Sequence, residues 1–375
     1  MRQIYLDYNA STPLAPSVRK AMLPFLSEHF GNPQSQHIHG LAVREAIDES
    51  CSRVAALFGA NKNEIIFTAS GTESNNLALK GVLPLLPSSG KNRLLITEDD
   101  HPSITQTAHY FQKLGYRVDV LATDSLGVVD LDQFHELLTD QTAIVSVPFA
   151  NPALGTIQPI ADLALACRKR NILFHTDATY GIGKSRIHVQ ELEVDMLSFS
   201  GSKMYAPPGT GGLYVRAGLS LTPLIHGGTH ASCLRGGTEN VAGILGLGAA
   251  AKLIYYNLND FVEKMETHRD RLCELLCNQI SDLVVRTQWT ESLPNTLCLQ
   301  FPQMSPSNIL ASIPELSAAV VEIPSIKEPL FLGEKLPKEE ALSLSVGWFT
   351  TKEEIDQVAQ LIIHAWEQIT AHRRG

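Results

Sequence analysis

The sequence of 375 residues lacks the features of several large protein classes. No apolar run approaches the length of a membrane span, and residues 1–5 do not lead into the apolar segment of a secretion signal. Lysine and arginine are scattered along the chain, and the formal net charge of −9 offers no basic surface to a nucleic acid. We therefore expect a cytoplasmic protein that binds neither membranes nor nucleic acids.

Cysteine is sparse as well. The 6 cysteines show neither a CxxC spacing nor a metal-binding pattern, so we expect reduced thiols and no metal site. Cys273 and Cys277 stand four residues apart on an expected helix, where two buried apolar positions explain them better than a redox pair. No expected strand runs into a G-x-G-x-x-G helix start, which makes a nicotinamide-dependent dehydrogenase a poor interpretation.

Apolar segments of strand length alternate with helical patterns through the first two thirds of the chain. The expected strands are residues 64–68, 93–97, 117–121, 142–147, 172–176, 194–199 and 211–215, after one helix over residues 16–29. This alternation predicts an α/β fold with a mostly parallel seven-stranded sheet covered by helices on both faces. We expect an N-terminal arm over residues 1–15 that packs with the small domain, a large domain over residues 16–255, and a small α+β domain over residues 256–375.

Two charged residues at strand ends carry the functional prediction. Lys203 follows a buried strand and precedes Pro207-Pro208-Gly209, so a tight turn would hold it partly desolvated. Desolvation lowers the pKa of a lysine, which can then act as an amine nucleophile and form a Schiff base. Asp177 ends the preceding strand, and a lysine with a carboxylate is the pair that pyridoxal phosphate (PLP) requires. Alone, Lys203 could be a solvated loop lysine and Asp177 a helix N-cap.

Three other polar segments follow strands and would meet at the same edge of the sheet. Ser70-Gly71-Thr72 opens a helix and could form a phosphate cup or could simply cap that helix. His101 could stack on a flat cofactor and carry protons, or could be a surface-loop histidine. Asn151 could donate to the phenolic oxygen of PLP or build the turn before Pro152.

With these residues in place, the chain resembles the cysteine desulfurase family, within the class V aminotransferases of fold-type-I PLP enzymes. The matching motifs run from Tyr5 to the last helix, and they are residues 5–13, 31–33, 67–76, 177–179, 198–203 and 235–240. The resemblance implies a homodimer with shared active sites in which Lys203 holds PLP, Asp177 pairs with the pyridine nitrogen and His101 stacks on the ring. It further implies that the remaining cofactor contacts come from Gly71, Thr72, Asn151, Ser200, Ser202 and Thr238, with Thr238 reaching in from the partner subunit.

The chain departs from the family on the substrate side. Residues 317–329 correspond to the loop that carries the catalytic cysteine, and they contain no cysteine. Ser343 stands where the family has the arginine that binds the substrate carboxylate, and charge-assisted pairs of that kind are strong. Ser202 replaces a histidine, and Tyr180 replaces a glutamine. Cys233, in a Gly-rich loop, is the alternative thiol.

Three functions fit this combination. The first is a PLP-dependent cysteine desulfurase-like enzyme acting on cysteine or a related amino acid, with a sulfur-acceptor protein as a further partner. The second is a C–S lyase, a racemase or another amine-processing enzyme on the same scaffold, which needs Lys203 and His101 as proton carriers but no thiolate. The third is a non-catalytic homologue that binds PLP.

Overall fold

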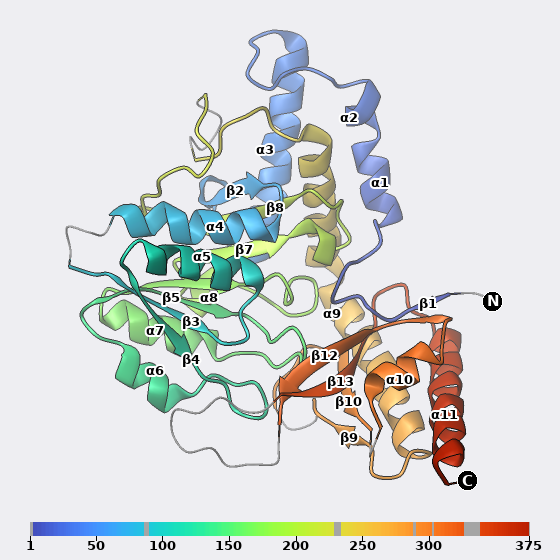
Figure 1. Ribbon diagram of the computed structural model, residues 1–375. Helices are drawn as coiled ribbons and strands as arrows, with labels where there is room; N and C mark the ends of the chain where they lie inside the picture. The colour runs from blue at the N-terminus through green and yellow to red at the C-terminus, as the bar shows by residue number, and fades with distance from the viewer. Residues whose placement is uncertain are drawn as a thin grey trace.

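A seven-stranded sheet forms the centre of the larger part of the molecule. The computed structural model describes residues 3–85, 90–228, 234–287, 290–301, 304–325 and 338–374 (Figure 1). In sheet order the strands are β2 (Ile65–Thr68), β8 (Gly211–Val215), β7 (Met196–Ser200), β6 (Leu173–Asp177), β5 (Thr142–Pro148), β3 (Arg93–Thr97) and β4 (Arg117–Leu121). Among these seven, β8 alone runs opposite to its neighbours. The predicted, mostly parallel sheet is confirmed.

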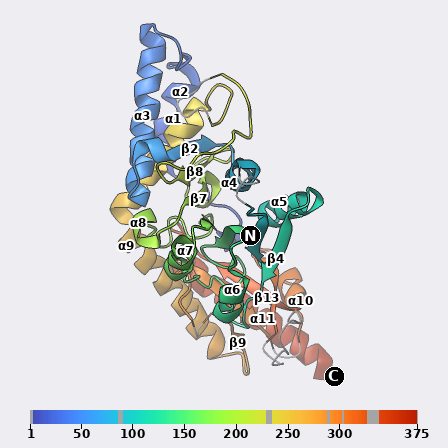
Figure 2. The same cartoon turned by 90° about the vertical axis from the view of Figure 1, so that its left-hand side faces the viewer.

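Alternate residues of these strands face two apolar layers. Leu94 and Met196 belong to the layer shared with α4 (Gly71–Val82) and α5 (Pro102–Lys113). Leu95 and Leu197 belong to the other layer, which forms the main core. The helices along the chain on that side are α3 (Ile38–Phe58), α6 (Leu131–Leu137), α7 (Ile160–Lys169) and α8 (Val189–Leu192). The view in Figure 2 shows α4 and α5 on one face of the sheet and α7 and α8 on the other. Alternate side chains of each strand are thus buried on opposite faces of the sheet, and both faces are covered by helices.

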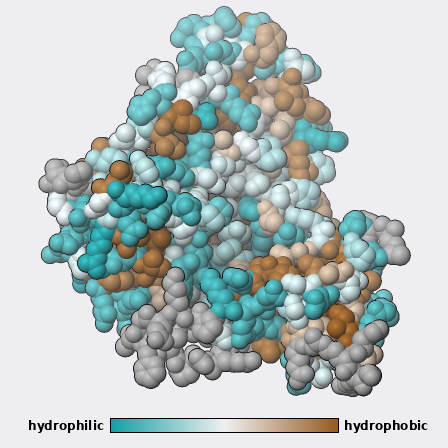
Figure 3. All heavy atoms as spheres, viewed as in Figure 1, coloured by the Kyte–Doolittle hydropathy of each residue, from teal (hydrophilic) through white to brown (hydrophobic). Residues whose placement is uncertain are grey.

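The N-terminal helix differs from its prediction. One helix was expected over residues 16–29, but the structure has α1 (Pro16–Met22) and α2 (Pro24–Ser27). Pro24 has no N–H to donate to the preceding turn, so the helix is interrupted there. Exposed apolar side chains gather on and just after these helices (Figure 3), and they are Leu23, Leu26, Phe30 and Ile38.

A four-stranded antiparallel sheet forms the core of the smaller domain. Its strand order is β12 (Ala319–Pro324), β13 (Lys338–Ser345), β10 (Thr296–Gln300) and β9 (Val284–Val285), with α10 (Pro306–Ala311) and α11 (Lys352–Arg374) packed beside it. The N-terminal strand β1 (Ile4–Tyr5) pairs in parallel with β11 (Leu316–Ser317). The arm therefore lies against the small domain before it reaches the large one.

Helix α9 (Val241–Cys277) runs from one domain into the other (Figure 1). By length and composition it is the one described helix that could span a membrane, and 56% of its apolar window is buried. It packs against α1, α3 and α11, which is the behaviour of a core helix.

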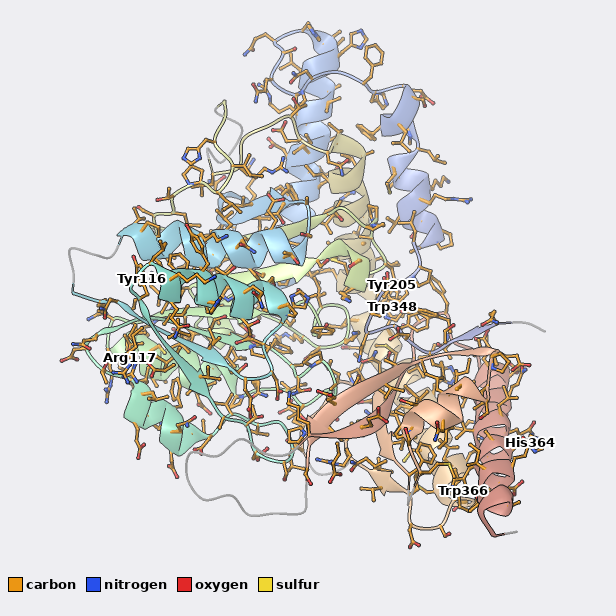
Figure 4. The ribbon with its side chains drawn as sticks, in the orientation of Figure 1. Tyr116, Arg117, Tyr205, Trp348, His364 and Trp366 are labelled. Carbon is orange, nitrogen blue, oxygen red and sulfur yellow. The ribbon has the colours of Figure 1, made fainter. Side chains whose placement is uncertain are left out.

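An aromatic stack joins the two domains near the sheet edge. Trp348, after β13, lies 3.7 Å from the ring centre of Tyr205 and 3.9 Å from that of Phe261, with interplanar angles of 15°. The Trp348 main-chain N–H donates to the Tyr205 hydroxyl at 2.7 Å. Figure 4 shows Tyr205 and Trp348 side by side at the junction. Tyr205 has a φ of 61°, which a bulky residue rarely adopts, and these contacts hold it there.

Replacing Trp348 with alanine should weaken the whole fold. The Trp348→Ala variant would lose a buried aromatic side chain between two rings, and we expect the free energy of unfolding to fall by about 3–5 kcal/mol. Urea unfolding followed by circular dichroism measures the change. Tyr256→Ala, at a position 72% exposed, is the matched control and should change the free energy by about 0.5 kcal/mol or less. Equal effects of the two substitutions would contradict a structural role for the stack.

Candidate functional site

The carboxyl ends of five strands bring the predicted site residues to one edge of the large sheet. Lys203 follows β7, Asp177 ends β6, and Gly71 follows β2. His101 follows β3 and Asn151 follows β5. These residues are neighbours at this edge, although they are spread over more than 130 positions of the sequence. The crevice outside the carboxyl ends of strands is where open α/β sheets bind ligands.

Lys203 is held by the N-terminal arm. The chain leaves β7 through a short 3-10 helix, Gly201–Lys203, whose last residue is the lysine. Its Nζ donates to the main-chain carbonyls of Asn9, at 2.7 Å, and of Ala10. Burial lowers the pKa of Lys203, while the carboxylates of Asp7 and Asp177 partly restore it. The side chain is therefore a desolvated amine held in one place, as the sequence predicted.

Asp177 is buried and receives two hydrogen bonds. Its Oδ1 accepts from the main-chain N–H of Thr179 at 2.9 Å, and its Oδ2 accepts from Asn75 Nδ2 at 2.7 Å. His175 lies two residues before Asp177 in β6, on the same face of the strand. Its two ring nitrogens form hydrogen bonds with Ser146 Oγ and Ser198 Oγ, at 2.9 Å each. Burial lowers the pKa of His175 to about 4, so this histidine is neutral at physiological pH.

A chain of hydrogen bonds connects Asp177 to His101. Asn75 Nδ2 donates both to Asp177 and, at 2.8 Å, to Ser103 Oγ. Ser103 Oγ lies 2.8 Å from His101 Nδ1, and the Ser103 main-chain N–H donates to the same nitrogen at 3.1 Å. Because Nδ1 accepts, the ring proton of His101 is on Nε2. His101 thus caps α5 and leaves its exposed ring and its Nε2–H free to face a ligand.

The turn before α4 forms a narrow cradle. Ser70 Oγ accepts from the main-chain N–H of Glu73 at 3.1 Å, so Ser70 acts as the helix N-cap. A Cβ on Gly71 would lie 2.9 Å from Thr179 Oγ1 and 3.4 Å from Ser200 Cβ, so glycine leaves space here. Thr179 Oγ1 is buried without a hydrogen-bond partner.

Thr72 is exposed at the start of α4. Ser200 Oγ lies 3.1 Å from Ser202 Oγ. The free N–H groups of a helix start, several hydroxyls and an unpaired buried oxygen suit a phosphate, so the residues fit PLP in this position.

Three other predicted residues lie less directly at the site. Asn151 Nδ2 donates to Asp99 at 3.1 Å, and its Oδ1 accepts from the N–H groups of its own turn, so it builds that turn. Thr238 is exposed on the loop before α9. Cys233 lies outside the described residues. The expected contacts of Asn151 and Thr238 with PLP, and the role of Cys233 as the alternative thiol, stay predictions.

The substrate side is closed by the small domain. Ser343 is buried in β13, opposite Cys298 of β10 and Ala319 of β12. Of the loop that replaces the family's cysteine loop, residues 317–325 are described, and 319–324 form β12. Tyr180 places its ring 5.2 Å from Lys203 Nζ.

No described thiol is prepared to act as a nucleophile at this site. Burial raises the pKa of Cys298 to about 12 and that of Cys51 to about 11, and it raises the pKa of Cys167 further. Cys273 and Cys277 lie 4.0 Å apart on α9, in the small domain, and because Cys273 is half-buried and Cys277 is exposed, the expectation of two buried positions is wrong. The described residues also contain no cluster of three or more metal-ligating side chains.

Sequence reasoning missed four residues that organise the site. They are Asn75 and Ser103, which link Asp177 to His101, and Asn9 and Lys184, which lie behind Lys203. The position of Asn75 could have been predicted to lie near the site, because it stands on the expected helix one turn after Gly71. Asn9 and Lys184 are 175 positions apart, and nothing in the local sequence connects them.

Comparison with known proteins gives one consistent family. Residues 4–358 match the family model for class-V aminotransferases. A cysteine desulfurase IscS of Dictyoglomus turgidum is 37% identical over 377 aligned residues, covering 98% of this chain and 95% of that protein. Among solved structures, a NifS-like protein superposes with a TM-score of 0.89 at 31% identity, covering 97% of this chain and 99% of the other.

A second solved structure was determined with an amino acid. SspA in complex with cysteine is 32% identical, has a TM-score of 0.75, and covers 84% of this chain and 88% of its own. Both solved structures support the expected fold.

Exchanging Asn75 for aspartate should damage the site. Asn75→Asp would replace the donor 2.7 Å from Asp177 with a second buried carboxylate. We expect the free energy of unfolding at pH 7.5 to fall by about 3 kcal/mol, and to recover partly as the pH is lowered and one carboxylate takes a proton. Urea unfolding over a series of pH values measures this. The control is Asn76→Asp on the next, less buried position, and a similar loss in both variants would contradict the role of Asn75.

Proposed function

This chain is a cysteine desulfurase-like member of the class-V aminotransferase family, whose enzymes depend on PLP, and we propose that Lys203 holds PLP here for a reaction on cysteine or a related amino acid. The observation that carries the proposal is the pair of neighbouring strand ends. One ends in a desolvated amine, and the other ends in a carboxylate linked to His101 through two hydrogen-bonding side chains.

We propose for PLP the contacts that the resemblance to the family implies. Lys203 would bind the aldehyde of PLP, Asp177 would face the pyridine nitrogen, and His101 would cover the ring. Gly71, Thr72, Ser200 and Ser202 would hold the phosphate, with Asn151 at the phenolic oxygen. When bound, PLP withdraws electrons from the substrate's α-carbon, which weakens the bonds around that carbon.

The protein's own residues would move the protons. The amine of Lys203 would take a proton from the substrate's α-carbon and return it. The lowered pKa of Lys203 supports this role, because a neutral amine is needed. His101 carries its proton on Nε2, away from its own helix, so it is placed to donate to the substrate side. Asn75 orients the Asp177 carboxylate by donating to its Oδ2.

A β-elimination at cysteine is the second candidate, and the state of the thiols favours it. Desulfuration transfers the sulfur of cysteine to a thiolate and leaves alanine, whereas β-elimination releases sulfide and leaves pyruvate and ammonia. The described cysteines are either buried with raised pKa values or lie on the far part of α9. Cys233 is the remaining candidate thiol for persulfide formation, and with it a sulfur-acceptor protein.

We further propose that the chain works as a homodimer in the cytoplasm. The exposed apolar residues Leu23, Leu26, Phe30 and Ile38 form a surface that a second copy would cover, with Thr238 reaching the partner's phosphate site. The five described cysteines form no disulfide, which supports a reducing compartment.

Removing Lys203 should abolish covalent cofactor binding. Purified protein mixed with PLP should show the visible absorbance of the protein-bound cofactor, and borohydride should fix the cofactor to Lys203, located by peptide mass spectrometry. Lys203→Ala should lose both signals while keeping its circular dichroism spectrum. Lys184 lies beside the site, so its replacement is unsuited as a control. Lys113→Ala, at an exposed position at the end of α5, serves instead. Retention of the absorbance in Lys203→Ala would exclude the assignment.

Restoring a guanidinium at position 343 should strengthen amino-acid binding. Ser343→Arg would supply a bidentate partner for a carboxylate, and we expect about tenfold tighter binding of L-alanine to the PLP-loaded protein. A spectral titration measures the dissociation constant. Ser343→Leu, which adds bulk without charge, is the control. Unchanged affinity in a folded Ser343→Arg variant would mean that β13 presents this position away from the substrate.

A further inference from the structure

A second lysine is buried beside Lys203. Lys184 is 4% exposed, and its Nζ donates to Asn9 Oδ1 at 2.8 Å. Burial and the nearby charge of Lys203 lower the pKa of Lys184 to about 7, and no described carboxylate offsets them. Burying a lysine without an acidic partner is costly, so its retention needs a reason.

The turn after β6 is shaped to place this lysine. Gly183 has a φ of 73°, and a Cβ there would lie 3.3 Å from Ile254 Cδ1 and 3.4 Å from Trp348 Cζ2. The Lys184 main-chain N–H donates to the Gly181 carbonyl at 3.1 Å. The chain that begins at Asp177 therefore turns tightly beneath the aromatic stack and brings Lys184 to the back of the site.

Asn9 joins Lys184 to the reacting amine and to the small domain. Its carbonyl accepts from Lys203 Nζ at 2.7 Å, while its Oδ1 accepts from Lys184 and, at 3.0 Å, from Asn295 Nδ2. Its Nδ2 donates to Thr296 Oγ1 and its N–H donates to Ser345 Oγ, both at 2.9 Å. Every polar group of this buried residue is used, so its position is fixed only when all these partners are present.

We propose that Lys184 is a positioning residue for the reaction at Lys203, acting through Asn9. By donating to the Asn9 side chain, Lys184 fixes the arm whose two carbonyls receive the amine of Lys203. The inference rests on the proposed function, because it assumes that Lys203 is the residue that reacts with PLP.

The charge of Lys203 also influences the proton on Lys184. Two ammonium groups close together repel, so the charged form of Lys184 is disfavoured. The titratable groups that face them are Asp7 of the arm, Asp177 of β6 and Tyr180 after it, and the small-domain contacts are neutral side chains. A neutral Lys184 still donates to Asn9 Oδ1 and can hold the arm in place.

Capture of PLP by the cofactor-free protein tests the positioning role. The rate at which PLP becomes attached to Lys203, trapped by borohydride and located by mass spectrometry, should fall about tenfold in Lys184→Met and about tenfold in Asn9→Ala. Because Lys184 acts through Asn9, the double variant should be about tenfold slower as well, whereas independent effects would multiply to about a hundredfold. Lys113→Met is the control for the same exchange at an exposed position.

Acetylation without PLP gives a second readout, which a merely structural role would not move. The rate of Lys203 acetylation at pH 8 should rise in Lys184→Met, because the carbonyls of the arm no longer hold the amine, and should return toward that of the unchanged protein in Lys184→Arg, which can still donate to Asn9 Oδ1. An unchanged capture rate and acetylation rate in Lys184→Met, or multiplicative losses in the double variant, would overturn the proposal. If Lys184→Met does not fold, Asn9→Ala tests the same link from its other end. Failure of the unchanged protein to attach PLP at Lys203 would instead reject the proposed function.

Discussion

Two main-chain carbonyls of the N-terminal arm receive the amine of Lys203, and the rest of the site depends on that contact. The arm reaches this place because β1 pairs with β11 of the small domain and Asn9 bonds to β10 and β13. The amine of Lys203 is thus positioned by a segment that belongs to neither of the two large sheets. A shift of the small domain would be transmitted to Lys203 through this arm, which bonds to that domain at β1, Leu6, Tyr8 and Asn9. On the other side, the same lysine is fixed by the turn that ends in Tyr205, stacked on Trp348.

Much of this arrangement could be predicted from the sequence. The alternation of strands and helices indicated seven strands, and their order along the sheet places the segments after β2, β3, β5, β6 and β7 at one edge. Lys203, Asp177, Gly71 and His101 were found because polar residues directly after apolar strands must lie there. Pro24 carried its signal in the sequence too, since a proline inside a helical pattern removes a hydrogen bond.

The remaining features depend on contacts between distant parts of the chain. The link from Asn75 through Ser103 to His101 needs α4 and α5 to pack side by side, which no local pattern encodes. Lys184 carries no local signal in the sequence, and only the fold places it beside Asn9. Asn151 was correctly placed after β5, but its side chain is used within its own turn, an outcome that the sequence left open.

The cofactor side and the substrate side of the site differ in character. Around Lys203 and Asp177 most hydrogen-bonding groups have partners, while Asn75 Oδ1 and the Thr179 hydroxyl beside the Gly71 cradle are buried without one. Toward the small domain, a buried serine and an unreactive buried thiol face each other across β10 and β13 where a guanidinium would be expected. The proposed site therefore has a lysine and a carboxylate for PLP, but it has no arginine at position 343 and no cysteine within residues 317–329.

The most direct test is to add L-cysteine to the PLP-loaded protein, follow the visible spectrum and identify the products. A spectral change with release of alanine is the result that a cysteine desulfurase-like enzyme predicts, and it would make Cys233 the next residue to replace. Pyruvate with sulfide would assign β-elimination on the same scaffold. A cofactor spectrum that does not respond to cysteine, with neither product formed, would contradict an enzyme that acts on this amino acid.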